Sequence, residues 1–199
     1  MTRHKPRNER ENQIIEAAIR CFSATGYHKT TMDDIAEEVG LSKGSLYRYF
    51  KNKKQLFLEI LDYYAEPWED QVEEALGNTA TASEKIRLMI MMSAELTLQA
   101  EMQELARITL DFYSVMRFDQ EVNEALRATI DPLFQVFIDI IEEGIASGEF
   151  KEVNARQAGI AIMGALDGMG IYDMMNVRDF NFMEATRIYI DIILAGLKK

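Results

Sequence analysis

Polar and basic side chains are concentrated in one short stretch of the chain. The stretch combines four hydrogen-bonding side chains with three lysines that follow directly: Lys43, Ser45, Arg48 and Tyr49, then Lys51, Lys53 and Lys54. Such groups donate hydrogen bonds to guanine O6 and N7 and to phosphate oxygens. Lysines at a helix start oppose the helix dipole, and become favourable once an anion lies against them. The stretch is therefore typical of a nucleic-acid contact, although each cation alone also fits an ordinary solvated surface.

Two short helices and a tight turn are predicted to position these side chains. The apolar positions of the first helix follow the spacing i, i+3, i+4 and i+7, namely Met32, Ile35, Ala36 and Val39. Thr31 and Asp34 have the spacing of a capping box at its start, and Gly40 ends it. Ser42 is an N-cap candidate for the second helix. Two helices joined in this way form a helix-turn-helix, whose second helix enters the major groove of DNA.

Helix is predicted along the rest of the chain as well. No stretch shows the alternation of a strand, so the fold class is all-α with about nine helices. An amphipathic helix precedes the helix-turn-helix and ends at Gly26. A connecting helix over 53–75 is expected to be bent or broken near Pro67. Five further helices are expected at about 82–99, 102–116, 120–146, 155–175 and 181–197.

Charge is divided unevenly between two predicted domains, 1–52 and 53–199. The net charge of the chain is −11, which by itself disfavours a nucleic-acid partner. Residues 1–55, however, carry 11 Lys and Arg against 7 Asp and Glu, a net charge of +4, and the remainder carries 11 against 26, or −15. This asymmetry favours a small basic DNA-binding domain attached to an acidic body.

The segment TTMDDIAEEVGLSKGSLYRYFKNKKQLF, residues 30–57, resembles the DNA-binding signature of the tetracycline-repressor (TetR/AcrR) family. The likeness depends on features at the family's spacing: Thr31, Ile35-Ala36, Gly40, Ser42, Gly44, Leu46-Tyr47, Tyr49-Phe50, Lys53 and Leu56. The match spans roughly 45 residues in all, because it includes the helix that precedes this segment, and the rest of the chain matches the family only in length and helical plan. The resemblance implies a transcriptional regulator with an N-terminal helix-turn-helix and a C-terminal bundle that binds a ligand and forms a homodimer.

The resemblance also implies roles for individual residues in binding double-stranded DNA. Lys43 is expected to donate to guanine O6 and N7 and Ser45 to pair with several bases, while Gly44 lets the helix backbone approach the groove. Arg48 is expected to contact a base or a phosphate. Lys53 is expected to be a phosphate clamp that does not depend on sequence.

Contacts to the DNA backbone are expected from three further residues. Thr31 and the free N–H groups at its helix start would hold a phosphate. Tyr47 and Tyr49 would each touch a phosphate or a thymine methyl, with core packing as the alternative for Tyr47. Asp33 is unfavourable near phosphate, so we interpret it as a charge that complements the N-terminus of its helix, with an acceptor for cytosine N4 as the alternative.

A ligand pocket in the C-terminal domain is expected to be apolar with a few polar groups. The candidate lining residues are Trp68, Met89, Met92, Glu95, Phe112, Tyr113 and Met116. These aromatic and thioether side chains suit a small apolar ligand, and ordinary core packing explains each of them equally well. Glu95 would neutralise a cationic ligand, unless it faces solvent.

The last two predicted helices are the candidate homodimer interface. Small residues form one face and larger apolar residues the other: Ala161, Gly164, Ala165 and Gly168, then Ile188, Tyr189 and Ile192. The family arrangement implies a four-helix bundle between two subunits, and a tight crossing within one subunit is the alternative. Ligand binding would then shift the connecting helix and change the separation between the two DNA-binding domains, which releases the repressor from a near-palindromic operator.

Enzymatic function is disfavoured by the residue inventory. The only histidines, His4 and His28, lie in or near the DNA-binding domain, and there is no Cys-x-x-Cys pair, P-loop or G-x-G-x-x-G fingerprint. We therefore expect no metal, no cofactor and no membrane span, and a cytoplasmic location. A DNA-binding regulator that has no small-molecule effector and is controlled by a protein partner remains an alternative.

Overall fold

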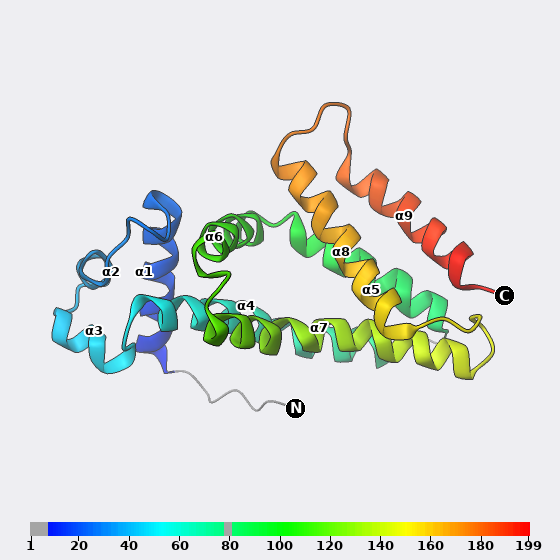
Figure 1. The fold of residues 1–199 in the computed structure, drawn as a ribbon, viewed down its shortest axis with the longest axis horizontal. Helices are drawn as coiled ribbons and strands as arrows, with labels where there is room; N and C mark the ends of the chain where they lie inside the picture. Colours follow the sequence, from blue (N-terminus) through cyan, green and yellow to red (C-terminus); the bar gives the residue numbers. More distant parts are fainter. Residues whose placement is uncertain (1–7, 78–80) are drawn as a thin grey trace. The chain divides into compact units, whose positions relative to one another are not determined.

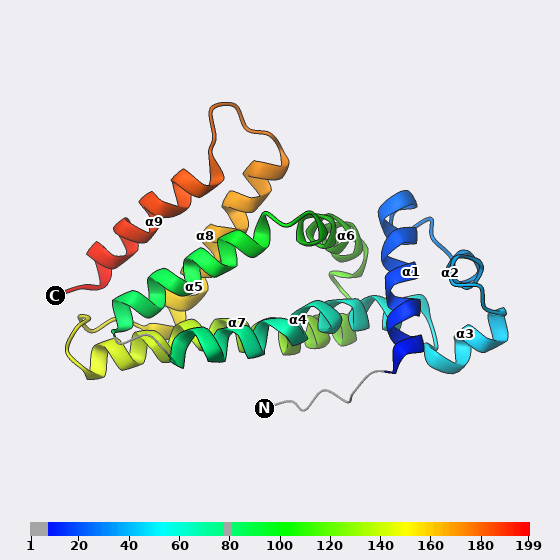
Figure 2. The same ribbon diagram turned by 180° about the vertical axis from the view of Figure 1, so that it is seen from behind.

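The computed structural model describes the backbone of residues 8–77 and 81–199, and their side chains except those of 65–70, 73, 115 and 116. Over these ranges the chain forms nine helices (Figures 1 and 2): α1 Glu9–Thr25, α2 Met32–Glu38, α3 Lys43–Tyr49, α4 Lys53–Gly77, α5 Ala82–Thr97, α6 Ala100–Met116, α7 Gln120–Ala146, α8 Ala155–Met174 and α9 Phe182–Leu197. The predicted all-α fold class is confirmed. The predicted bounds of the last five helices agree with α5–α9 to within two residues.

Local capping sets where several helices begin. Thr31 and Asp34 form the predicted capping box at α2, and the Asn154 side chain accepts from the backbone N–H of Gln157 at α8. The Asn52 side chain accepts from the backbone N–H of Gln55 at 2.8 Å, at the start of α4. Each cap pairs a backbone N–H that the helix itself leaves unpaired.

Helix α4 runs without interruption from Lys53 to Gly77, so a break near Pro67 is the wrong prediction. A proline removes one hydrogen bond from the helical ladder and presses on the preceding turn, which bends a helix without necessarily ending it. Pro132 lies inside α7 in the same way. The alternative to a break, a bend of α4 near Pro67, stays a prediction.

The chain forms two compact units that do not follow its linear order. Unit 1 contains residues 1–70 and 104–129, and unit 2 contains 71–103 and 130–199. Helices α4, α6 and α7 therefore each contribute to both units. These units are defined by contacts between segments and not by position along the chain. They therefore do not test the domain boundary expected between residues 52 and 53, which stays a prediction.

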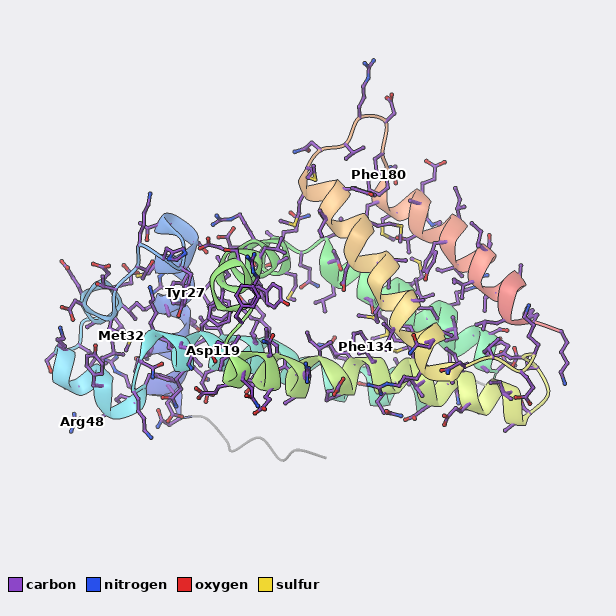
Figure 3. All side chains as sticks on the ribbon, viewed as in Figure 1. Tyr27, Met32, Arg48, Asp119, Phe134 and Phe180 are labelled. Carbon is purple, nitrogen blue, oxygen red and sulfur yellow. The ribbon has the colours of Figure 1, made fainter. Side chains whose placement is uncertain are left out.

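The core of unit 1 contains a cluster of four aromatic rings, contributed by Phe22, Tyr27, Phe57 and Phe112. The rings of Phe57 and Phe112 stack with centroids 4.0 Å apart, and Tyr27 meets both edge-on at 5.5 and 4.8 Å. Tyr27 lies in the turn between α1 and α2 and is labelled in Figure 3. The cluster joins α1, α4 and α6 around that turn, and offset or edge-on ring pairs of this kind stabilise a core.

The core of unit 2 is built where α5, α8 and α9 contact one another. Its fully or almost fully buried side chains include Ile86 and Ile90 from α5, Ile162 from α8 and Ile190 from α9. In the loop that follows α7, the Glu149 carboxylate accepts from the backbone N–H groups of Ala82 and Ser83, each at 3.0 Å. A side chain from a distant loop thus caps α5.

None of the described helices combines the length and the apolar character that crossing a bilayer requires.

Candidate nucleic-acid interface

Helix α3 presents most of the side chains that are predicted to read DNA. The Ser42 Oγ accepts from the backbone N–H of Ser45 at 3.2 Å and fixes the start of the helix. Leu46 has no exposed surface and anchors the inner face, while Gly40, at φ +67°, allows the turn from α2. The opposite face is exposed at Lys43, Gly44, Tyr47 and Arg48, the last of which is labelled in Figure 3.

The two other predicted contacts on α3, Ser45 and Tyr49, are half-buried. The Ser45 hydroxyl lies 2.9 Å from that of Ser42 and accepts from Arg48 Nη2 at 3.4 Å. Tyr47 is 42% exposed, which excludes a core role for its ring. Four of the six predicted contacts on α3 are thus exposed to solvent, as contact with base edges and phosphates requires.

Lys43 is paired with the carboxylate of Asp33. The Nζ–Oδ2 distance is 2.9 Å and both side chains are mostly exposed. The hydrogen bond and charge of Asp33 raise the pKa of Lys43. Asp33 lies in the first turn of α2, as interpreted from the sequence, and it also holds the lysine that is predicted to read guanine. An exposed ion pair is weak, so this lysine can exchange Asp33 for a base.

The hydroxyl of Thr31 is occupied by Asp34. Thr31 Oγ1 donates to Asp34 Oδ2 at 2.8 Å, and the backbone N–H of Thr31 donates to the same oxygen at 2.7 Å. These hydrogen bonds from Thr31 lower the pKa of Asp34. A phosphate contact by Thr31 therefore stays a prediction, and it requires the hydroxyl to turn away from Asp34.

The ammonium of Lys53 is directed into the turn between α1 and α2. It donates to the carbonyl oxygens of Tyr27 at 2.5 Å, Thr30 at 2.7 Å and His28 at 3.3 Å. It also lies 4.3 Å from the centre of the Tyr27 ring. Burial lowers the pKa of Lys53, although Asp111 and Asp34 act in the opposite direction. Sequence reasoning missed these partners.

Helix α6 holds the same turn and the last part of α1 from another side. The Asp111 carboxylate accepts from the backbone N–H of Tyr27 at 2.7 Å, and Arg107 Nη2 donates to the Ser23 carbonyl at 2.6 Å. Each pair is separated by 84 residues in sequence, so no local pattern predicts it. The sequence offered one indirect signal. Tyr27 follows the glycine at which α1 ends, so its backbone N–H has no partner within the helix and needs an acceptor elsewhere.

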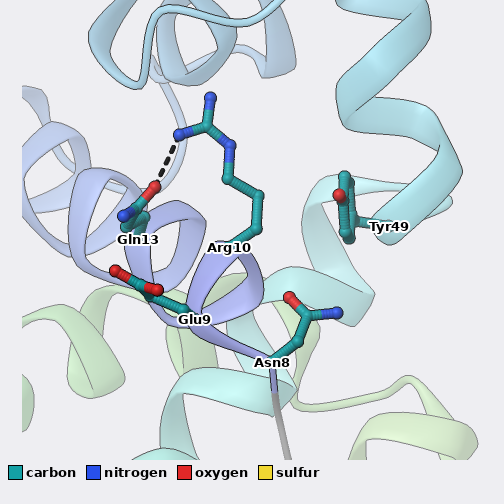
Figure 4. Close-up of a pocket in the computed structure, with 5 residues that line it drawn as sticks. All are labelled: Asn8, Glu9, Arg10, Gln13 and Tyr49. Carbon is teal, nitrogen blue, oxygen red and sulfur yellow. Dashed lines mark hydrogen bonds between the residues drawn. The ribbon is translucent and has the colours of Figure 1, made fainter.

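An open pocket of about 390 Å³ lies at the N-terminus of α1, beside the last residue of α3 (Figure 4). Its lining residues are Asn8, Glu9, Arg10, Gln13 and Tyr49. Arg10 Nη1 donates to Gln13 Oε1 at 2.5 Å. Every lining residue carries a polar or charged group, and the pocket is shared by Arg10 and the predicted DNA contact Tyr49. Arg10 is therefore a cation beside the predicted DNA-binding face that the sequence analysis did not single out.

The predicted ligand residues are divided between the two units. In unit 2, Met89 is buried, Met92 is half-buried and Glu95 is exposed on α5. In unit 1, Phe112 is a fully buried member of the aromatic cluster, and Tyr113 is 46% exposed. The side chains of Trp68 and Met116 lie outside the described residues. Ligand contact by this set stays a prediction.

The predicted dimer residues on α8 and α9 are exposed or half-buried. Ile188 and Ile192 are 56% and 63% exposed, and nothing lies within 4 Å of where a Cβ would stand at Gly164 or Gly168. Ala161 is exposed and Ala165 half-buried. The Tyr189 hydroxyl donates to the Ile162 carbonyl at 3.3 Å, which ties α9 to α8 within one subunit.

Comparison with known proteins identifies the family. Residues 14–60 match the family described as bacterial regulatory proteins, tetR family, and residues 64–199 match the C-terminal region of QacR-like protein. The fatty acid metabolism regulator protein of Bacillus subtilis (strain 168) is 29% identical over 196 residues, 97% of this chain and 98% of its own. The HTH-type transcriptional regulator QacR of Staphylococcus aureus is 30% identical over 148 residues, 73% of this chain and 77% of its own.

A solved structure shows the same similarity in three dimensions. The crystal structure of the transcriptional regulator FadR from Bacillus subtilis in complex with stearoyl-CoA has a TM-score of 0.80 and 28% sequence identity, and the match covers 93% of this chain and 98% of that one. Both the N-terminal segment and the longer C-terminal segment of the chain thus match family models, and the helix-turn-helix lies within the first of them. The chain belongs to the tetR family of bacterial regulatory proteins and is a DNA-binding transcriptional regulator.

Proposed function

We propose that this regulator is a homodimeric repressor that is released from a near-palindromic operator by a long-chain acyl-coenzyme A. The observation that supports this ligand class is the similarity to FadR, which extends over almost the whole of both chains and whose crystal structure contains stearoyl-CoA. The apolar side chains predicted for the pocket, such as Met89 and Met92, suit the acyl chain of such a ligand.

A second candidate is an apolar cation. Residues 56–199 carry a net charge of −15, which attracts a cation and repels the phosphates of coenzyme A. Glu95 is exposed on α5, so its carboxylate would pair with such a cation at the protein surface and not inside a closed pocket. The acyl-CoA assignment rests on full-length similarity and the cation on charge alone, and we therefore favour the former.

In the proposed complex, α3 of each subunit enters a major groove. Lys43, Gly44 and Ser45 face the bases, while Tyr47, Arg48 and Tyr49, together with Thr31, contact the backbone or a thymine methyl. The two recognition helices would meet successive major grooves about 34–36 Å apart along the duplex. Such a regulator works in the cytoplasm, where the chromosome lies, and catalyses no reaction.

The homodimer would form through α8 and α9. Their exposed isoleucines, Ile188 and Ile192, and the open small-residue positions Gly164 and Gly168 support close packing against a second copy. Ligand binding would move α4 and change the separation of the two helix-turn-helix domains, which disfavours the DNA-bound state.

The first experiment selects bound duplexes from a random DNA library and titrates the best one at several salt concentrations. We expect a near-palindromic site whose affinity falls steeply with salt. The complex is then titrated with stearoyl-CoA, with coenzyme A, with stearate and with a lipophilic quaternary ammonium.

Release by stearoyl-CoA alone supports the proposed ligand. Release by the quaternary ammonium supports the cation. No release by any of these compounds overturns both ligand assignments and favours control by a protein partner, while the absence of an enriched duplex contradicts the proposed operator.

A further inference from the structure

The ammonium of Lys53 has no hydrogen left for a phosphate. A lysine ammonium carries three hydrogens and accepts none. The three carbonyl oxygens that it contacts, those of Tyr27, His28 and Thr30, lie at 2.5–3.3 Å. A phosphate contact would require the lysine to give up at least one of these bonds.

The segment that Lys53 holds is compact, and the residues at the two ends of the Lys53 contact, Tyr27 and Thr30, are buried while His28 and Lys29 are exposed. Gly26 adopts φ +82°, and its carbonyl accepts from both the backbone N–H and the hydroxyl of Thr30, at 3.3 and 2.8 Å. Tyr27 and Thr30 are 3% and 1% exposed. The carbonyls of this turn therefore converge on one point, and a compact cation on a flexible stem fits that point better than a planar guanidinium does.

The turn leads directly into α2, which packs against α3. Thr31, the predicted phosphate contact at the start of α2, is the next residue after Thr30. Because Lys53 begins α4, its three hydrogen bonds set the distance between the start of α4 and the start of α2. Losing them would displace Thr31 and α3 from the positions in which they meet DNA.

We propose that Lys53 is a positioning residue for DNA binding, which fixes the turn between α1 and α2 from the start of α4 and does not itself contact phosphate. This assignment rests on DNA binding by the helix-turn-helix and replaces the phosphate clamp that the sequence suggests for Lys53.

The test compares K53M, K53R and K51M in the full-length protein, by titrating the selected operator at several salt concentrations. A plot of log K against log salt has a negative slope, and each lost phosphate contact lowers the magnitude of that slope by about 0.9. We expect K53M to lose about tenfold in affinity with an unchanged slope, because the charge lost is not one that neutralises a phosphate. Lys51 is exposed two residues away, so K51M measures the effect of removing a nearby accessible cation.

The arginine variant separates the two roles further. A phosphate clamp accepts arginine, whereas three convergent carbonyls do not match its planar fork. We therefore expect K53R to bind as weakly as K53M. A decrease of about 0.9 in the magnitude of the slope for K53M, together with wild-type affinity for K53R, would overturn the proposal.

Folding is checked by circular dichroism and thermal unfolding of each variant. If K53M does not fold, K53Q takes its place, because the glutamine amide keeps two donors without the charge. For K53Q, an unchanged slope with an affinity below that of the wild type supports positioning, and a slope whose magnitude falls by about 0.9 contradicts it. Failure to enrich any duplex would instead count against the proposed operator.

Discussion

The Asp111 carboxylate in α6 accepts a hydrogen bond from the backbone N–H of Tyr27, at 2.7 Å. Tyr27 is almost fully buried and begins the turn that follows Gly26. This bond pairs a backbone donor that would otherwise face the core. It also attaches α6 to the same turn that Lys53 holds from α4.

Removing the Asp111 carboxylate is expected to destabilise the protein. D111A leaves the Tyr27 N–H unpaired in a buried position, which costs about 1–3 kcal/mol in the free energy of unfolding. Urea denaturation followed by circular dichroism measures this loss. D111N is the matched control, because its amide oxygen still accepts the bond, and we expect it to be destabilised less. Equal losses in the two variants would show that the hydrogen bond is not what stabilises the turn.

Truncating Phe112 separates its core role from its predicted ligand role. The ring has no exposed surface and stacks on Phe57, so F112A is expected to lower the free energy of unfolding by about 3–5 kcal/mol. F112L should cost less and leave affinity for stearoyl-CoA unchanged. A selective loss of ligand affinity in F112L, measured by titration calorimetry on folded protein, would assign Phe112 to the pocket instead.

Asp34 is expected to contribute to stability above its ordinary pKa and to lose that contribution in acid. Hydrogen bonds from Thr31 lower the pKa of Asp34 from its usual 3.8, so the folded state favours the ionised carboxylate. The contribution is fully present above pH 3.8 and disappears as the pH falls through the lowered folded value. Urea denaturation of wild type and D34N should therefore differ most near neutral pH and converge in acid. A constant difference across that range would contradict the assignment.

Lys43 is expected to act on specificity. K43M should bind the selected operator about tenfold more weakly, because a good pair between lysine and guanine discriminates against the wrong base. A duplex changed at that base should bind wild type and K43M equally. D33N removes a carboxylate near the groove and frees Lys43, so it should bind all duplexes more tightly. Uniform weakening of every duplex by K43M would instead identify Lys43 as a phosphate contact.

The exposed isoleucines of α9 are expected to be required for dimerisation. Ile188 and Ile192 lie four residues apart on one helical face, and I188E with I192E would bury two carboxylates in the proposed interface. Analytical ultracentrifugation should then give the mass of a monomer, and operator affinity should fall. R187E changes charge at an exposed neighbouring position and should remain a dimer. A dimeric mass for the double variant would place the interface elsewhere.

The sequence predicted what depends on neighbours along the chain. The caps at Thr31, Ser42 and Asn154 use partners three residues away, so their spacing alone revealed them. Helix α3 was predictable for the same reason, since its inner face alternates with its polar face at helical spacing.

The contacts that hold the turn between α1 and α2 were not predictable in this way. Lys53 and Asp111 reach that turn from 23 to 84 residues away, and each side chain also has an ordinary place on a helix surface. Phe112 shows a similar limit, because a buried aromatic residue has the same periodicity in a core as beside a ligand. Only the packing of α6 against α1 and α4 distinguishes the two.

The helix-turn-helix is often regarded as a module that can be transferred between proteins. In this chain, the contacts of the turn between α1 and α2 show that such a module must include residues beyond the helix-turn-helix itself. A chimera joined after residue 52 would transplant the Gly26–Thr30 turn without Lys53 or Asp111, the side chains that pair its carbonyls and one of its N–H groups. Grafting this recognition helix onto another sensor therefore requires the start of α4 and the middle of α6 to be carried with it. The transferable piece is discontinuous in sequence.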